Sequence, residues 1–203
     1  MSQVWLITGA SRGLGRALTE AALAAGHRVL ATARNPKHLV GIANKFEQSV
    51  RTVSLDATDE NQAQNAVDTA IRAFGRVDVL VNNEGFSESL SKEVRPLGVR
   101  VTIVEPGGFR TDFAGSSTKL RAGRPDYEAT VGATVRFQRD YNGKQPGDPA
   151  KAAAALLHIA SLPEPPLRLL LGSDAYDAAQ RHASEILASD REWKALTTST
   201  DFS

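Results

Sequence analysis

Residues 4–15 read VWLITGASRGLG, a short apolar run followed by a glycine-rich turn and the start of a helical pattern. Glycine has a physical reason to stand at three of these positions. Gly9 permits a tight turn, Gly13 lets the backbone approach a pyrophosphate, and Gly15 lets the helix pack closely on the strand. The N-terminus of the helix also presents free N–H groups and the positive end of its dipole to phosphate. A purely structural glycine turn is the alternative, but the position between first strand and first helix favours a dinucleotide-binding unit.

Short β-branched runs alternate with helical patterns along the chain. Most of these runs are apolar on both faces, as strands are when helices cover both sides of a sheet. The alternation predicts an α/β fold, a Rossmann-like doubly wound parallel sheet with helices on both faces. The expected strands are 4–8, 28–32, 51–55, 77–82, 99–105 and 167–172, and the expected helices are 13–25, 36–46, 59–74, 87–97, 148–160 and 173–196.

The 203 residues are expected to form a single domain, because that length lies within the usual range for one. Residues 114–147 are rich in Gly, Ser, Arg and Lys and show no strong periodicity. A stretch of this kind inside a compact domain is predicted to be a lid or substrate loop. The polar tail 197–203 is expected to fray.

The composition argues against several classes of partner. A net charge of +1 provides no field that would attract nucleic acid or anionic lipid. The chain has no cysteine, and its 4 histidines lie far apart, so no metal site is predicted. No apolar run reaches the ~20 residues that span a bilayer, and the first strand starts too early to leave room for a signal peptide. We therefore expect a soluble cytoplasmic protein without nucleic-acid, membrane or metal partners.

The end of the second strand indicates which dinucleotide would bind. A cofactor with a free ribose 2′-hydroxyl usually meets an acidic residue at this point. This chain has Arg34 and Asn35 there, and a second arginine, Arg12, in the glycine loop. Two guanidinium groups suit a 2′-phosphate, which they can bind bidentately. The sequence therefore predicts NADP, with NAD less favoured, unless Arg34 is merely a solvated surface charge.

The glycine spacing of TGASRGLG resembles the TGxxxGxG of the short-chain dehydrogenase/reductase (SDR) family. In the same order, 55–58 (LDAT) resembles the segment whose Asp contacts adenine, and 82–85 (NNEG) resembles the NNAG turn. Residues 106–111 (PGGFRT) resemble the segment that supports the nicotinamide, with Thr111 placed to meet its carboxamide. The resemblance runs from residue 4 to about 202 and implies NADP-dependent hydride transfer to or from a small carbonyl or alcohol. The expected cofactor-binding residues are Gly9, Ser11, Arg12, Gly13, Leu14, Gly15, Arg34, Asn35, Asp56, Ala57, Asn83, Gly85, Pro106, Gly107 and Thr111.

The resemblance is interrupted after residue 85. In the family, NNAG is followed by a helix with a catalytic Asn, a fifth strand ending in a catalytic Ser, and a helix carrying Tyr-x-x-x-Lys. Here residues 86–94 (FSESLSKEV) follow at once and resemble the end of that last helix. Roughly sixty residues are therefore missing, about two βα units. None of the tyrosines Tyr127, Tyr141 and Tyr176 has a lysine four positions on, so no catalytic residue is assigned, and a substitute pair of Tyr141 with Lys144 is not expected.

The shortened chain keeps strand and helix in alternation. A helix over 87–97 would be about 16 Å long, the length of a five-residue strand, and could make one short right-handed crossover. We therefore expect strand 99–105 to lie beside strand 77–82, in one sheet of six strands instead of seven, ordered 3-2-1-4 and then the last two. The alternative is a gap where the family's fifth strand would be, with unpaired backbone edges on both sides.

Three functions follow from this sequence. The chain could be an SDR oxidoreductase, a non-catalytic NADP(H)-binding protein, or a non-functional deletion variant. Losing a positioned acid or base alone costs about 10²–10⁴-fold in rate, so we expect impaired or absent catalysis. The helices at the interruption commonly form the family's dimer interface, so a family-like homo-oligomer is not expected.

Overall fold

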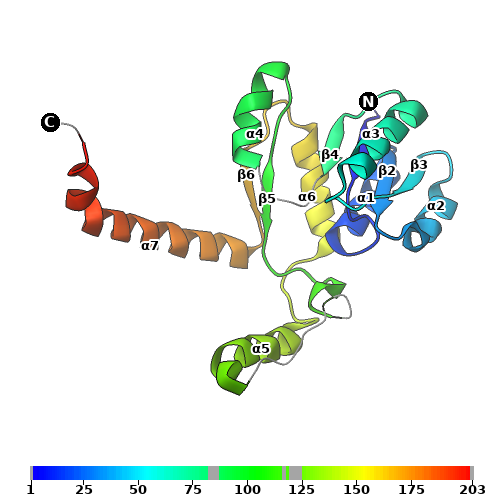
Figure 1. The fold of residues 1–203 in the computed structure, drawn as a ribbon. Helices are drawn as coiled ribbons and strands as arrows, with labels where there is room; N and C mark the ends of the chain where they lie inside the picture. Colours follow the sequence, from blue (N-terminus) through cyan, green and yellow to red (C-terminus); the bar gives the residue numbers. More distant parts are fainter. Residues whose placement is uncertain (1, 82–86, 116–117, 119–124, 202–203) are drawn as a thin grey trace.

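A computed structural model describes residues 2–81, 87–115, 118 and 125–201 of the protein (Figure 1). Strands and helices alternate along these residues. The strands are β1 (Val4–Ile7), β2 (Arg28–Ala33), β3 (Val50–Ser54), β4 (Val79–Val81), β5 (Ile103–Pro106) and β6 (Arg168–Leu171). The α-helices are α1 (Gly13–Ala24), α2 (Val40–Phe46), α3 (Glu60–Phe74), α4 (Ser87–Val94), α5 (Ala133–Tyr141), α6 (Pro149–Ser161) and α7 (Ser173–Thr198).

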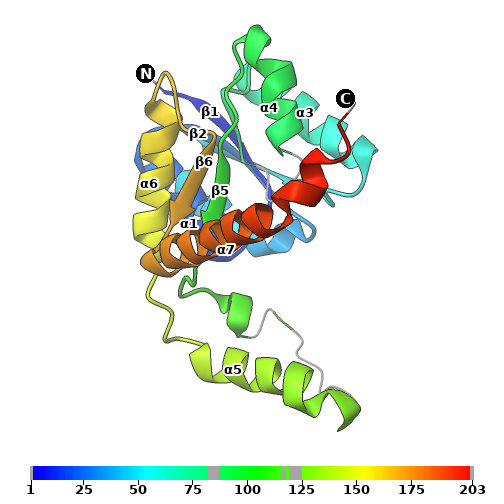
Figure 2. The same ribbon diagram turned by 90° about the vertical axis from the view of Figure 1, so that its left-hand side faces the viewer.

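Four strands form a parallel sheet in the order β3-β2-β1-β4. All of β1 is buried, and its alternate residues point to opposite faces of the sheet. Trp5 and Ile7 lie in one apolar cluster with residues of α1 and α6, whereas Val4 and Leu6 lie in a second cluster with residues of α3. The prediction of a parallel sheet with helices on both faces is confirmed (Figures 1 and 2).

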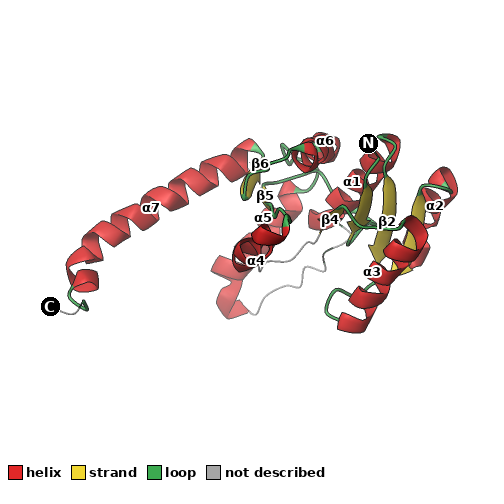
Figure 3. Ribbon diagram, turned by 90° about the horizontal axis from the view of Figure 1, so that it is seen from above, coloured by secondary structure: helices red, strands yellow, loops and turns green. Residues whose placement is uncertain are grey.

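The last two strands, β5 and β6, form a separate parallel sheet. The prediction that strand 99–105 joins strand 77–82 is therefore wrong. The described residues contain six strands, but they are divided into a sheet of four and a sheet of two (Figure 3). The alternative, a gap beside β4, is the arrangement that the structure has.

β5 remains with β6 because contacts around the pair hold it there. Arg100, which precedes β5, donates from Nε and Nη2 to the carboxylate of Glu164, which precedes β6, at 3.2 and 2.5 Å. The Thr102 hydroxyl donates to Pro166 O at 2.7 Å. The helix before β6, α6, packs against α1 through buried Ala153. Moving β5 beside β4 would break these contacts, so a helix of suitable length was not sufficient to close the sheet.

The gap leaves β4 with β1 as its one strand partner among the described residues. β4 is short, and the side chain of its central residue, Leu80, is 60% exposed. β5 likewise has β6 as its one partner in the described part of the chain. Within the described residues, no further strand therefore pairs with the outer edge of β4 or of β5.

Two stretches expected to lack regular structure contain helical residues, while the roles expected for them, a lid or substrate loop and a frayed tail, stay predictions. The stretch 114–147, expected without regular structure, contains a π-helical turn at Glu128–Gly132 and then α5. The rings of Phe137 and Tyr141, one helical turn apart, stack with centroids 5.3 Å apart and support α5. At the other end of the chain, α7 continues to Thr198, into the tail expected to fray. α7 extends away from the rest of the molecule, and none of its residues is buried (Figures 1 and 3).

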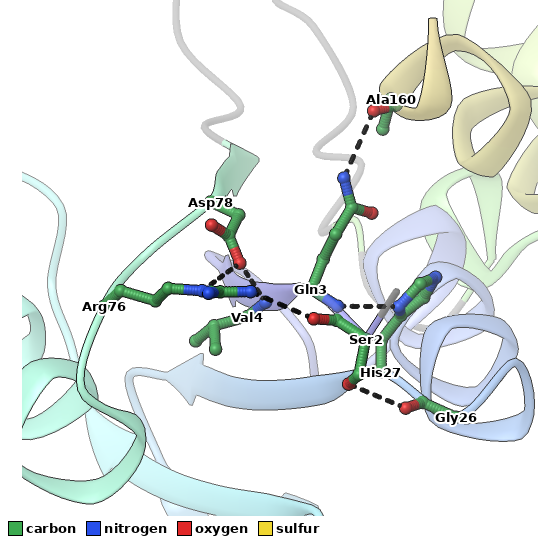
Figure 4. Close-up of polar contacts among 8 residues, drawn as sticks. All are labelled: Ser2, Gln3, Val4, Gly26, His27, Arg76, Asp78 and Ala160. Carbon is green, nitrogen blue, oxygen red and sulfur yellow. Dashed lines mark hydrogen bonds and ion pairs between the residues drawn. The ribbon is translucent and has the colours of Figure 1, made fainter.

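The amino ends of the strands are fixed by polar contacts (Figure 4). Asp78 Oδ2 accepts from Val4 N–H at 2.8 Å and from Arg76 Nε at 2.9 Å. Gln3 Nε2 donates to Ala160 O at the end of α6, at 3.4 Å. These contacts hold β1, β4 and α6 together at the end of the sheet opposite the glycine loop.

Candidate nucleotide-binding site

The glycine loop joins β1 to α1 in a conformation that requires glycine. Gly9 and Gly13 have φ angles of 65° and 58°, in the left-handed region that other residues rarely adopt. A Cβ on Gly15 would lie 2.5 Å from Gly9 O, so α1 starts in direct contact with the turn. Ala10 N–H donates to Thr32 O at 2.8 Å and ties the loop to β2. The close approach inferred from the sequence is present.

The first turn of α1 has the features of an anion site. Arg12 is its N-cap residue, with extended backbone and no side-chain hydrogen bond to the helix. The first N–H groups of a helix have no partner within the helix, and here no cap side chain takes them. Such a terminus binds phosphate through these N–H groups and the helix dipole. Ser11 and Leu14, also expected to contact the cofactor, are half-buried in the same turn.

The ends of β2 and β3 lie side by side beyond the loop. Ser54 Oγ donates to Arg34 O at 3.2 Å. β3 ends at Ser54, and Asp56 lies two residues further on. Hydrogen bonds from the Thr58 N–H and hydroxyl lower the pKa of Asp56, burial opposes them, and the Arg34 guanidinium lowers it further. The Arg34 charge is the smallest of these effects, and the assignment of both residues to one nucleotide half stays a prediction.

The other predicted residues near this edge differ in their exposure and hydrogen bonding. The side chain of Asn35 accepts from Lys37 N–H at 3.1 Å and caps the short 3₁₀ helix Pro36–Leu39, so its oxygen is already used. Ala57 is exposed beside Asp56. Arg12 and Arg34 are both exposed, and no ion pair joins either of them to another described residue. Both guanidinium groups are therefore available to an external anion.

The segment after β5 reaches back to the glycine loop. A Cβ on Gly13 would lie 3.6 Å from Thr111 Cβ, so these residues are in contact although 98 positions separate them in the sequence. Gly107 N–H donates to Leu171 O at 2.8 Å, and Gly108 N–H donates to Asp174 Oδ2 at 2.6 Å. The structure thus brings together the phosphate loop and the segment expected to support the nicotinamide.

An open hollow of about 450 Å³ lies where these two segments meet. Gly13 and Thr111 line it, as do residues that the sequence did not single out. Arg110, one of these, is fixed by a hydrogen bond from its Nε to Gln145 O at 2.7 Å. The full lining is Gly13, Arg110, Thr111, Asp112, Asn142, Gly143 and Pro149.

The sequence reasoning missed Asp174 and Tyr141, both of which contact the turn after β5. A Cβ on Gly108 would overlap the Tyr141 hydroxyl. The position of Asp174, three residues after β6 ends, could have indicated a site residue, because ligands of such sheets bind at the carboxyl ends of the strands. Two predicted residues, Asn83 and Gly85, lie outside the described residues.

A metal site and a membrane span each need features that the described part of the chain lacks. No three His, Asp or Glu side chains converge there as metal ligands would. None of the described helices combines the length and the apolar character that a membrane span needs.

Sequence comparison identifies the class of this fold and its family. The sequence model of the short chain dehydrogenase family matches residues 3–89. Oxidoreductase BOA17 of Botryotinia fuckeliana is 34% identical, over 97% of this chain and 98% of that protein. A crystal structure of a short-chain dehydrogenase from Streptomyces avermitilis is 32% identical and covers all of both chains, with a TM-score of 0.87. The fold is thus that of a dinucleotide-dependent oxidoreductase, and the chain belongs to the short-chain dehydrogenase family.

Two more distant structures share the fold and hold a dinucleotide. Serine dehydrogenase complexed with NADP+ is 17% identical with a TM-score of 0.66, over 83% of this chain and 94% of that one. An SDR from Burkholderia phymatum in complex with NAD is 16% identical with a TM-score of 0.73, over 95% of each chain. These likenesses show the fold alone. The first of these structures holds NADP+ and the second holds NAD, so the likenesses do not distinguish the two cofactors.

The comparison also bears on the length of this chain. The alignment with oxidoreductase BOA17 extends over 270 positions, 67 more than the 203 residues of this chain. At least that many positions therefore hold residues of the relative and none of this chain. This number of positions is close to the roughly sixty residues, about two βα units, that were expected to be missing. That they are missing after residue 85 stays a prediction.

Proposed function

We propose that this chain binds NADP and carries out little or no hydride transfer of its own. The gap between β4 and β5 is the observation that carries the second part. In the family that this chain resembles, the strand in that position ends in the catalytic Ser, and the following helix carries Tyr-x-x-x-Lys. This chain has no Tyr-x-x-x-Lys anywhere in its sequence. A dinucleotide fold without its proton donor supports binding better than turnover.

The residues present fit an NADP molecule in two halves. The N–H groups at the start of α1 would hold the pyrophosphate, Asp56 the adenine, and Arg12 with Arg34 the 2′-phosphate. The segment containing Pro106, Gly107 and Thr111 would lie under the nicotinamide. Bound NADPH supplies the hydride, and the protein must supply orientation and the proton. Here the orienting residues remain, while the proton donor and the ribose-binding Lys of the family motif are absent.

Nucleotide titration tests the binding part. Isothermal titration calorimetry with NADP, NAD and 2′,5′-ADP is expected to give measurable binding of 2′,5′-ADP, weaker binding of NAD, and an NADP affinity little above that of 2′,5′-ADP. The last result follows from the missing contact to the nicotinamide ribose. Binding of NAD as tight as that of NADP would contradict the role of the two arginines. Failure of all three nucleotides to bind would leave the non-functional deletion variant as the better reading.

Turnover is tested separately. We expect negligible oxidation of NADPH with a panel of small aldehydes and ketones, the substrate class that the family resemblance implies. Tyr141→Phe is the informative variant, because the Tyr141 hydroxyl lies against Gly108 beside the nicotinamide segment. Ordinary reductase rates that fall in Tyr141→Phe would make Tyr141 a substitute proton donor and would overturn the proposed loss of activity.

A further inference from the structure

The Gly107–Gly108 turn is held by the first turn of α7. Gly108 N–H donates to Asp174 Oδ2 at 2.6 Å, across 66 positions of sequence, so the bond is a tertiary contact. Gly107 N–H donates to Leu171 O, the last residue of β6, at 2.8 Å. A hydrogen bond to an ionised carboxylate is about twice as strong as one to a neutral acceptor. The Asp174 contact is therefore the stronger of the two.

The turn is packed closely against other side chains on the side where each of its glycines would carry a Cβ. A Cβ on Gly107 would overlap the Asp174 carboxylate, and a Cβ on Gly108 would overlap the Tyr141 hydroxyl. Side chains from two separate segments, α7 and the end of α5, thus touch consecutive residues of the turn. Displacing the turn requires one of these side chains to move.

A general structural role does not account for the position of Asp174. An acidic residue in the first turn of a helix interacts favourably with the dipole, and an exposed carboxylate does this equally well. The Asp174 side chain instead turns inward, and its Oδ1 is buried without a hydrogen-bond partner among the described residues. Burying an unpaired carboxylate oxygen costs free energy. The contact with the turn is the interaction that this inward position gains.

The turn leads to Thr111, which lies against Gly13 of the phosphate loop. Arg110, between them in sequence, donates from its backbone N–H to Gly147 O at 3.0 Å. The segment from residue 107 to 111 is therefore fixed at both ends, by Asp174 at its start and by residue 147 and the glycine loop at its end. The position of the Gly107–Gly108 turn therefore affects where residues 107–111 lie in the nucleotide site.

We propose that Asp174 is a positioning residue, which fixes the Gly107–Gly108 turn and with it the nicotinamide half of the nucleotide site. The inference rests on the proposed function, because it takes this segment as the nicotinamide side. The adenosine half, formed by the glycine loop and the ends of β2 and β3, does not depend on Asp174.

Calorimetry on three variants tests the role. Asp174→Ala removes the acceptor, so the affinity for NADP should fall to that of 2′,5′-ADP, and the affinity for 2′,5′-ADP itself should stay unchanged. Asp174→Asn keeps an acceptor oxygen and should retain most of the NADP affinity. Asp177→Ala, the matched control, removes an exposed acid from the same helix and should change neither affinity.

Equal losses for both nucleotides in Asp174→Ala, or the same loss of NADP in Asp177→Ala, would overturn the proposal. A wild-type chain that binds neither nucleotide would instead overturn the proposed function. Hydrogen exchange separates the two cases without any ligand. The amides of residues 107–111 should exchange faster in Asp174→Ala and not in Asp174→Asn, and unchanged exchange in both would show that the carboxylate does not hold the turn.

Discussion

Two glycines in helices of this protein should respond to the same substitution with opposite signs. A Cβ on Gly15 would lie 2.5 Å from Gly9 O and 3.0 Å from Gly9 C, which are backbone atoms that cannot rotate away. A Cβ on Gly41, in α2, would meet nothing within 4 Å. Gly15→Ala should therefore lower the free energy of unfolding by about 1–3 kcal/mol through overpacking. Gly41→Ala should raise it by about 0.5–1 kcal/mol, because alanine is the better helix former.

Urea unfolding of the two variants measures both effects. The comparison controls for the substitution itself, since both remove a helical glycine. Stabilisation by Gly15→Ala would contradict the close contact between the glycine loop and α1, on which the phosphate site depends.

At Asp56 the expected effect is on the pH dependence of stability. Its pKa lies below the ordinary value of 3.8, chiefly because the Thr58 N–H and hydroxyl donate to it and, to a smaller extent, because of Arg34. A carboxyl with a lowered pKa stabilises the folded state above that ordinary value, and the contribution is lost as the pH falls from 3.8 through the folded pKa. Asp56→Asn should therefore reduce the loss of stability on acidification in this window, measured by urea unfolding. Thr58→Val, which keeps the N–H donor, should have a smaller effect in the same direction.

At the scale of the elements, α6 depends on one capping side chain. Asp148 accepts from Ala150 N–H at 2.8 Å, and Pro149 occupies the first helical position. The helix connects the two sheets, because it packs on α1 and leads into β6. Asp148→Ala should lower the free energy of unfolding by about 1 kcal/mol, and Asp148→Asn by much less, since its amide oxygen can also cap. Equal losses in the two variants, measured by urea unfolding, would contradict the cap.

Elements defined by local signals could be predicted well. The helix expected at 59–74 begins at Glu60 behind the N-cap Asp59 and ends at Phe74, where Gly75 has a φ of 86°. These signals lie within or next to the helix itself. α5 was missed although Ala133, Phe137 and Tyr141 recur at helical spacing, because it lies within a stretch rich in Gly, Ser, Arg and Lys that reads as a loop.

The candidate site also has one part that local sequence signals predict and one part that they do not. The glycine loop is a contiguous motif, and its geometry followed from the glycine positions alone. The contacts of the Gly107–Gly108 turn with Asp174 and Tyr141 join segments far apart in the sequence. Nothing local to any of these residues indicates its partner, so only the folded chain could show this part of the site.

At the scale of the whole molecule, the prediction of a closed sheet was wrong for a similar reason. The helix between β4 and β5 is long enough for the crossover. However, β5 is paired with β6, Arg100 before it bonds to Glu164, and α6 anchors this part of the chain on α1, and none of these contacts can be inferred from helix length. A strand that is already paired changes partner only if the new partner offers more backbone hydrogen bonds than the old one. β4 has three residues, which is too few to do so.

The outer edge of β4, which has no strand partner among the described residues, should therefore govern how the molecule behaves in concentrated solution. An unpaired strand edge is a template for pairing with another chain, and natural proteins blunt such edges with lysine. Leu80, the central residue of β4, is 60% exposed, and Leu97, in the turn after α4, is 78% exposed without belonging to a strand. We expect concentration-dependent self-association that Leu80→Lys reduces and Leu97→Lys does not, measured by light scattering over a range of protein concentrations. If both variants reduce association equally, general surface hydrophobicity is responsible. A wild-type chain that stays monomeric at every concentration would show that the β4 edge does not drive self-association.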